Sequence, residues 1–292
     1  MQFGGREASR ARTRGATLLV LGSIVSVQSG AALATGLFGS IGPAGAVLLR
    51  AGFGALALLA LMRGRLRLRG WPHRDVWLLG ASVAAVNLFF YAALDRLPLG
   101  ITVTLEFVGP LGVALLGSRR RRDLVWALLA AAGIVLLSGG TEGRGVDALG
   151  VALALIAGFF WGAYILQSAR VGALEPGIRG AALAALISTV LVAPFGIAQG
   201  GIELLTPTHL LVGAAVGVLS TAIPYAAEME ALRRLPQAVF GVLMSLEPAV
   251  AAAIGFIALA QDLSAREVVA IAFVVVASAG ALRSAATPSP RD

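Results

Sequence analysis

Residues 93–110 read ALDRLPLGITVTLEFVGP, and residues 231–248 read ALRRLPQAVFGVLMSLEP. Both stretches begin Ala-Leu-x-Arg-Leu-Pro, and a constant spacing of 138 residues carries the final Pro110 onto Pro248. Similarity at a fixed spacing indicates an internal repeat. Each stretch is apolar and holds one glutamate close to its last proline. The sequence therefore predicts two related halves, each with an acidic group inside an apolar segment.

The composition predicts a membrane protein. Of 292 residues, 58% are hydrophobic and 13% are charged, whereas a soluble domain carries about 25% charged residues. A helix needs about 20 apolar residues to cross a bilayer. The long apolar segments of this sequence are not interrupted by regularly alternating polar residues, which excludes the strands of a membrane barrel. We expect an all-α membrane protein of ten transmembrane helices, at about 17–36, 42–62, 76–94, 98–117, 124–139, 148–168, 180–199, 210–229, 238–260 and 268–282.

Arginine placement predicts the topology. The chain has 23 basic residues, all arginine, and a net charge of +8. With the N-terminus in the cytoplasm, 19 arginines fall on cytoplasmic segments, three on outer loops (Arg96, Arg144 and Arg266) and one, Arg50, inside a span. Cytoplasmic loops of membrane proteins are enriched in basic residues. The charge thus indicates cytoplasmic termini and contact with a lipid bilayer, with no need for nucleic acid.

The repeat and the topology together predict the domain organisation. Five spans return the chain on the opposite side of the membrane, so two five-span halves must be inverted. We expect a first repeat at 17–139, a second at 148–282, and cytoplasmic tails at 1–16 and 283–292. Transporters commonly use inverted repeats, with the substrate site near the midplane between the halves.

Three ionisable residues lie deep within predicted spans: Arg50, Glu106 and Glu247. Each costs about 2.5–3.5 kcal/mol on insertion scales, so such groups usually face a cavity or a partner. The two glutamates could bind a substrate amine or couple transport to protons; alternatively, Arg50 or a backbone group simply neutralises them. Arg50 is always charged, and could bind a substrate carboxylate or pair with a glutamate.

Prolines are expected to break three spans. Pro110, Pro224 and Pro248 cannot donate to the carbonyls four residues earlier, which are those of Glu106, Ser220 and Met244. Freed carbonyls near the midplane can coordinate a substrate ammonium. Alternatively, each proline only kinks its helix for packing, and a neighbouring side chain donates a hydrogen bond to the freed carbonyl.

Neutral polar residues are spread over several spans. They could line a polar cavity or hold helices together at about 0.6 kcal/mol each. As a set they favour a cavity lined by Gln28, Asn87, Tyr91, Trp161, Tyr225 and Ser245. The chain has no cysteine and only two histidines, and no metal, phosphate-binding or protease motif is present. We therefore expect no enzyme activity, no metal and no cofactor.

Several stretches resemble a known family: Val27-Gln28-Ser29-Gly30-Ala31, Pro98-Leu99-Gly100, residues 105–110, Pro224-Tyr225, Glu228-Met229, Arg234-Leu235-Pro236 and residues 244–249. They resemble the EamA family of the drug/metabolite transporter superfamily, and within it the bacterial threonine/homoserine exporters. This resemblance covers nearly the whole chain. It implies ten helices in two repeats around a central cavity, and amino-acid efflux driven by an ion or proton gradient.

The leading hypothesis is a secondary exporter of small neutral amino acids in the bacterial inner membrane, coupled to protons by alternating access. One alternative keeps the fold but exports another metabolite or a drug. Another is a membrane scaffold or sensor that transports nothing. The Ala-rich fifth and tenth spans leave open a homodimer.

Overall fold

The computed structural model describes residues 3–62, 73–116, 124–138, 147–174 and 178–286. Every regular element within these ranges is a helix. The first half holds α1 (Phe3–Thr35), α2 (Phe38–Leu61), α3 (Arg74–Leu94), α4 (Leu99–Glu106), α5 (Val108–Leu116) and α6 (Leu124–Ser138). The second holds α7 (Ala148–Leu174), α8 (Arg179–Gly200), the 3₁₀ segment η2 (Gly201–Leu205), α9 (Pro207–Gly217), the π-helical segment η3 (Val218–Ala222), α10 (Ile223–Leu232), α11 (Gln237–Met244), α12 (Glu247–Leu259) and α13 (Ala265–Ala286).

Nine helical stretches in the described chain, of 18 to 27 residues, are long and apolar enough to cross a membrane. They correspond to nine of the ten predicted spans, so the chain is a multi-pass membrane protein. The remaining predicted span is α6, whose described apolar part, Leu124–Leu137, is shorter. The helices extend into both predicted tails, because α1 begins at Phe3 and α13 ends at Ala286. Most of the basic segments 63–75 and 118–123, and the last residues of the C-terminal tail, lie outside the described residues.

Helix ends recur at the spacing of the sequence repeat. The end of α3 at Leu94 is followed 138 residues later by the end of α10 at Leu232. The start and end of α4 are likewise 138 residues before those of α11. Pro98 and Pro236 precede the two helices with nearly the same backbone conformation. The fourth span of each half is therefore broken at a corresponding place, after α4 in the first half and after α11 in the second.

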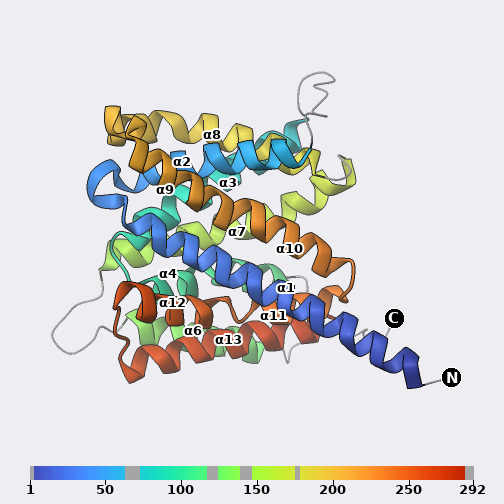
Figure 1. Ribbon diagram of the computed structural model, residues 1–292. Helices are drawn as coiled ribbons and strands as arrows, with labels where there is room; N and C mark the ends of the chain where they lie inside the picture. The colour runs from blue at the N-terminus through green and yellow to red at the C-terminus, as the bar shows by residue number, and fades with distance from the viewer. Residues whose placement is uncertain (1–2, 63–72, 117–123, 139–146, 175–177, 287–292) are drawn as a thin grey trace.

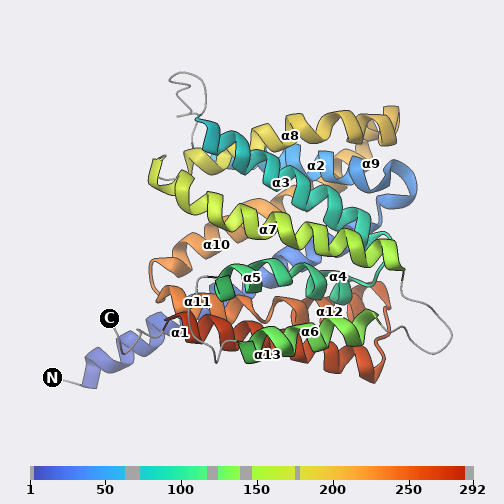
Figure 2. The same ribbon diagram turned by 180° about the vertical axis from the view of Figure 1, so that it is seen from behind.

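The helices of one half pack mainly on those of the other. Neighbouring pairs are α3 with α7, α2 with α8, α1 with α10, α4 with α12, and α6 with α13. In Figures 1 and 2, α2 and α8 lie at one edge of the bundle and α6 and α13 at the other. The Ala-rich spans α6 and α13 thus cover each other. The start of α1 and the end of α13 lie at one end of the bundle, which we call the tail end (Figure 1).

A glycine lets α7 approach the break between α4 and α5. A Cβ atom at Gly158 would lie 2.6 Å from the carbonyl oxygen of Glu106, closer than a real Cβ can come. Pro110 cannot donate to this carbonyl, which therefore faces the backbone of α7. This contact explains the small residues along α7: close backbone approach is how membrane helices pack without a hydrophobic driving force between them.

Side chains from the second half cap helices of the first at the end opposite the tails. Gln199 Oε1 accepts a 2.7 Å hydrogen bond from the N–H of Ala44, just after a kink at Gly42, whose φ of 69° suits glycine. Gln261 Oε1 accepts a 2.9 Å hydrogen bond from the N–H of Leu99. Both bonds satisfy first-turn amides that have no partner within their own helix.

Asp147 performs the same function for α7. Its Oδ1 accepts from the N–H of Gly150 at 3.0 Å, and its Oδ2 accepts from Nη1 of Arg96 at 2.9 Å. The backbone bond to Gly150, followed by the bond to Arg96, holds the pKa of the Asp147 carboxyl below its ordinary value. The three side chains Gln199, Gln261 and Asp147 therefore tie the halves together at this end.

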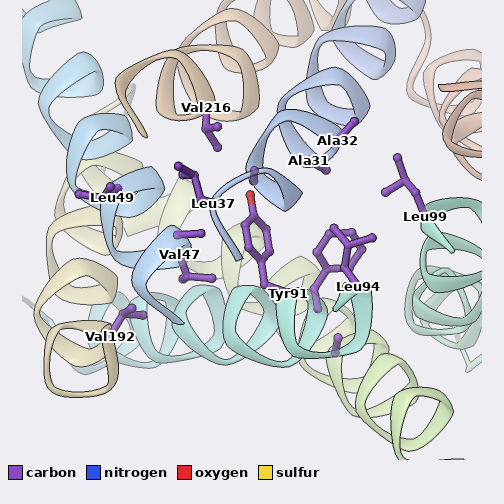
Figure 3. Packing of buried hydrophobic residues seen from close by; sticks show 14 of the residues in the cluster. Ala31, Ala32, Leu37, Val47, Leu49, Tyr91, Leu94, Leu99, Val192 and Val216 are labelled. Carbon is purple, nitrogen blue, oxygen red and sulfur yellow. The ribbon is translucent and has the colours of Figure 1, made fainter. Parts of the chain in front are cut away.

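The largest cluster of buried apolar side chains fills the region between these caps and the bundle centre. Figure 3 shows Tyr91 rising from α3 among Leu37, Val47 and Leu94. Tyr91 is fully buried and packs on Phe38 with ring centroids 5.7 Å apart. This cluster closes the bundle at the end opposite the tails.

Candidate functional site: a polar cavity between the two halves

A cavity of about 510 Å³ lies between the halves. Its walls come from α1, α2, α3 and α4 of the first half and from α7, α8, η3, α10, α11 and α12 of the second. The lining from α2, α7 and α8 runs from mid-helix toward the tail end. The cavity therefore extends from the centre of the bundle toward the tails. Its polar lining comprises Gln28, Arg50, Asn87, Glu106, Trp161, Tyr164, Ser168, Ser188, Ser220, Thr221, Tyr225, Glu228 and Glu247.

Glu106 and Glu247 both line this cavity at helix breaks. Glu106 is the last residue of α4, and Glu247 is the first of α12. Each is 7% exposed, and their charges lie close enough to interact. The break in α4–α5 corresponds to the break in α11–α12, yet the two carboxyls lie on opposite sides of it. Two carboxyls so close in low dielectric cannot readily be charged together.

Gln28 connects α1 to the second carboxyl. Its Nε2 donates a 3.0 Å hydrogen bond to Oε1 of Glu247. The other oxygen of Glu247, Oε2, has no hydrogen-bond partner among the described residues. Glu106 likewise interacts with described groups only electrostatically, with Glu247 and Arg50. Both carboxyls can therefore accept a hydrogen bond from a molecule in the cavity.

Arg50 lies on α2 and donates a hydrogen bond from Nη1 to Oδ1 of Asn87. Asn87 is itself oriented by a 2.7 Å bond from its Nδ2 to the carbonyl of Val83. The guanidinium carbon lies 5.5 Å from the centroid of the Tyr91 ring. No carboxylate among the described residues forms an ion pair with Arg50. Its charge is therefore available to a ligand in the cavity.

The prolines distort their spans in two ways. Pro110 and Pro248 follow true breaks, between α4 and α5 and between α11 and α12. Pro224 does not break its span: the π-helical segment η3 precedes it, and Ile223 N–H bonds to the carbonyl of Val218. This pairing skips the carbonyl of Leu219, which instead accepts a 2.7 Å hydrogen bond from Ser26 Oγ of α1. Single π turns inside helices often accompany functional sites.

The structure brings most of the predicted residues together, but not all of them. Gln28, Asn87, Trp161 and Tyr225 line the cavity with the three charged residues. Tyr91 and Ser245 were predicted to line it as well, and they do not. Tyr91 is directed into the apolar cluster of the closed end. Ser245 is fully buried, and its Oγ donates to the carbonyl of Val242 at 2.6 Å.

Glu228 and Tyr164 are not among the site residues predicted from the sequence. Both line the cavity, and Glu228 Oε1 accepts a 2.5 Å hydrogen bond from Ser23 Oγ. Glu228 lies near the end of its span, where a charged side chain can reach the membrane surface. One signal was available: Glu228 is three residues after Tyr225, and such residues share a helix face.

Comparison with known proteins identifies the family. The EamA-like transporter family matches residues 148–283. The threonine/homoserine exporter RhtA of Salmonella typhimurium is 43% identical over 265 residues, which is 90% of each chain. RhtA of Escherichia coli is 42% identical over the same share. The chain belongs to the EamA-like transporter family. One solved structure is 22% identical to this EamA-like chain, and the two superpose with a TM-score of 0.65. The match covers 90% of this chain and 95% of the solved chain, so the two proteins share a fold.

Membership of the EamA-like family shows the class of activity. The family and its threonine/homoserine exporters are transporters, so the chain is a membrane transporter and not an enzyme. This excludes the scaffold or sensor considered from the sequence. The cavity between the halves is the place where such a protein would hold its substrate.

Proposed function

We propose that this EamA-like transporter is a secondary exporter of small neutral amino acids, of the threonine and homoserine type, in the bacterial inner membrane. The names and 42–43% identity of its relatives support the substrate class and the membrane. The observation that carries the proposal is one cavity that holds two buried carboxyls and an arginine with no ion pair to a carboxylate of the described residues. An amino acid presents the complementary charges, a carboxylate and an ammonium, on one carbon.

The proposed substrate pose follows from these charges. The substrate carboxylate binds the guanidinium of Arg50, which offers a planar fork of donors. The ammonium binds between Glu106 and Glu247, whose free carboxyl oxygens can accept hydrogen bonds from it. Trp161, packed edge-on against Phe107 with ring centroids 5.3 Å apart, gives the cavity an apolar wall for the side chain. Tyr225 and Gln28 add further polar groups to the lining.

The proposed transport cycle uses two inverted repeats, 17–139 and 148–282. Support comes from helix ends that recur after 138 residues and from the family match over the second repeat. Arginines are concentrated on the segments that the topology assigns to the cytoplasm, so the tail end is taken to be cytoplasmic. The cavity then faces the cytoplasm, and rocking one repeat against the other opens the capped end.

Protons are the proposed coupling ion. The two carboxyls interact with each other, so a proton and a substrate ammonium are alternative ways of relieving their repulsion. Binding of protons from outside would displace the ammonium and release the amino acid. The proposal requires neither cofactor nor metal, and a homodimer through outer helix faces would leave this cavity unchanged.

The test is efflux of labelled threonine and homoserine from cells that express the protein, with and without a proton uncoupler. We expect efflux above the empty-vector control, and its loss when the uncoupler is added. An efflux rate that the uncoupler does not change would contradict proton coupling. No efflux, with the protein present in the membrane, would reject these substrates and direct the assay to other metabolites and drugs.

A further inference from the structure

Glu228 is a third carboxyl in the cavity, and the proposed substrate pose does not use it. It lies on α10, three residues after Tyr225, and lines the cavity. Among the described residues, its carboxyl accepts one hydrogen bond, the 2.5 Å bond from Ser23 Oγ. A hydroxyl can donate to a carboxylate without neutralising it. Glu228 is therefore an acid without a cationic partner in the described chain.

The arginines closest to Glu228 in sequence are already paired. Glu230, two residues later, bonds to Arg234 and lies 3.5 Å from Arg233. Residues two apart on a helix face different directions. Glu230 thus binds the arginines at the surface, while Glu228 faces the cavity. Among described groups on the elements around Glu228, α1 supplies Ser23, α7 supplies Tyr164, and α12 supplies Glu247.

The three carboxyls form a series along the cavity. Glu228 interacts electrostatically with Glu247, and Glu247 interacts with Glu106. Glu106 and Glu247 lie at the mid-span breaks, whereas Glu228 lies four residues before the tail end of α10 at Leu232. A cavity of about 510 Å³ can hold water between polar groups.

Resting on the proposed proton-coupled export, we propose that Glu228 is the carboxyl that passes the coupling proton from the Glu106–Glu247 pair to solvent at the tail end of the cavity. The O–H bond of protonated Glu247 breaks and its proton moves through water to the Glu228 carboxylate, forming an O–H bond there. Glu247 is left as a carboxylate that can bind the next ammonium. Glu228 then releases the proton to solvent.

The test separates proton movement from substrate movement in purified protein reconstituted in liposomes. Net efflux of labelled threonine driven by a pH gradient needs the proton step. Exchange of labelled for unlabelled threonine at equal pH does not. We expect Glu228→Gln to lose about a hundredfold in gradient-driven efflux, typical of a lost proton-transfer group, and to keep wild-type exchange. Glu228→Asp should recover part of the efflux.

Two variants serve as controls. Glu230→Gln makes the same chemical change two residues away at the surface, and both rates should stay at the wild-type level. Ser23→Ala removes the hydrogen bond to Glu228 but leaves the carboxyl, so exchange should stay at the wild-type level and efflux should fall much less than in Glu228→Gln. The amide oxygen in Glu228→Gln can still accept the hydrogen bond from Ser23, so this variant should still fold.

The proposal is overturned if Glu228→Gln drives efflux at the wild-type rate, or if it loses efflux and exchange equally. The first result would show that the proton bypasses Glu228, and the second that Glu228 is structural or binds substrate. A wild-type protein whose efflux is insensitive to the pH gradient would instead reject the proposed function itself.

Discussion

Gln28 and Glu247, 219 residues apart, are joined by a 3.0 Å hydrogen bond across the interface between the two halves. Ser23 and Ser26 of the same helix bond to Glu228 and to the carbonyl of Leu219. Three polar side chains of α1 therefore contact polar groups of the second half. Gln28 is the one of the three that contacts a carboxyl of the proposed substrate site.

Replacing Gln28 by leucine should impair export. The substitution leaves buried Glu247 without its hydrogen bond, and bonds to charged groups are worth about 1.5–3 kcal/mol. Because about 1.4 kcal/mol corresponds to tenfold, we expect efflux to fall at least about tenfold at equal expression. Ser29→Ala, next on α1 but outside the cavity lining, is the control. Equal efflux from Gln28→Leu and wild type would remove this bond from the mechanism.

Glu106→Gln should abolish export while the protein still inserts and folds. The amide retains the size of the carboxyl but can neither take up a proton nor pair with an ammonium. The measurement is threonine efflux, normalised to protein in the membrane. The surface substitution Glu230→Gln should leave export unchanged. Wild-type efflux by Glu106→Gln would exclude Glu106 from both substrate binding and coupling.

Arg50 should recognise the carboxylate of the substrate. In the wild type, threonine should compete with labelled substrate better than threoninol, which has the ammonium and hydroxyl but no carboxylate. Arg50→Gln should remove this preference, chiefly because threonine would compete less well with the labelled substrate. Arg50→Lys, which retains the charge but not the planar fork, should be intermediate. An unchanged preference in Arg50→Gln would place the carboxylate elsewhere.

Gly158→Ala should destabilise the protein without touching the cavity. The added Cβ would lie 2.6 Å from the carbonyl oxygen of Glu106, and overpacking typically costs about 1–3 kcal/mol. We expect a lower unfolding temperature in detergent. Gly112→Ala on α5, where a Cβ meets nothing within 4 Å, is the matched control. Equal unfolding temperatures for the two variants would contradict the close contact between α7 and the α4–α5 break.

The membrane orientation can be read from single cysteines, because the natural chain has none. His73 and Glu203 are both exposed. His73 directly precedes α3, which begins at the tail end of the bundle, and Glu203 lies in η2, which follows α8 at the opposite end. A membrane-impermeant thiol reagent added to whole cells should label Glu203→Cys and not His73→Cys. After the membrane is permeabilised, the reagent should label both variants. The reverse pattern would place the tails outside and turn the cavity to face outward.

The sequence by itself determined the nine spans that the described helices match, because the bilayer requires each segment to be apolar along its own length. The 138-residue repeat also predicted the corresponding breaks after Glu106 and Met244, since proline acts on its own helix. Glu106, Glu247 and Arg50 could be selected for the same local reason: a charge inside an apolar run is visible without knowing its neighbours.

The tertiary structure alone decided which polar side chains share a cavity. Tyr91 and Tyr164 are both tyrosines in apolar runs, yet Tyr91 packs into the closed end and Tyr164 lines the cavity. Glu228 lies near a helix end, and only packing against α1 directs it inward. These outcomes depend on contacts between residues far apart in the chain, such as Ser23 with Glu228, and the periodicity of one helix carries no information about the helix that will cover it.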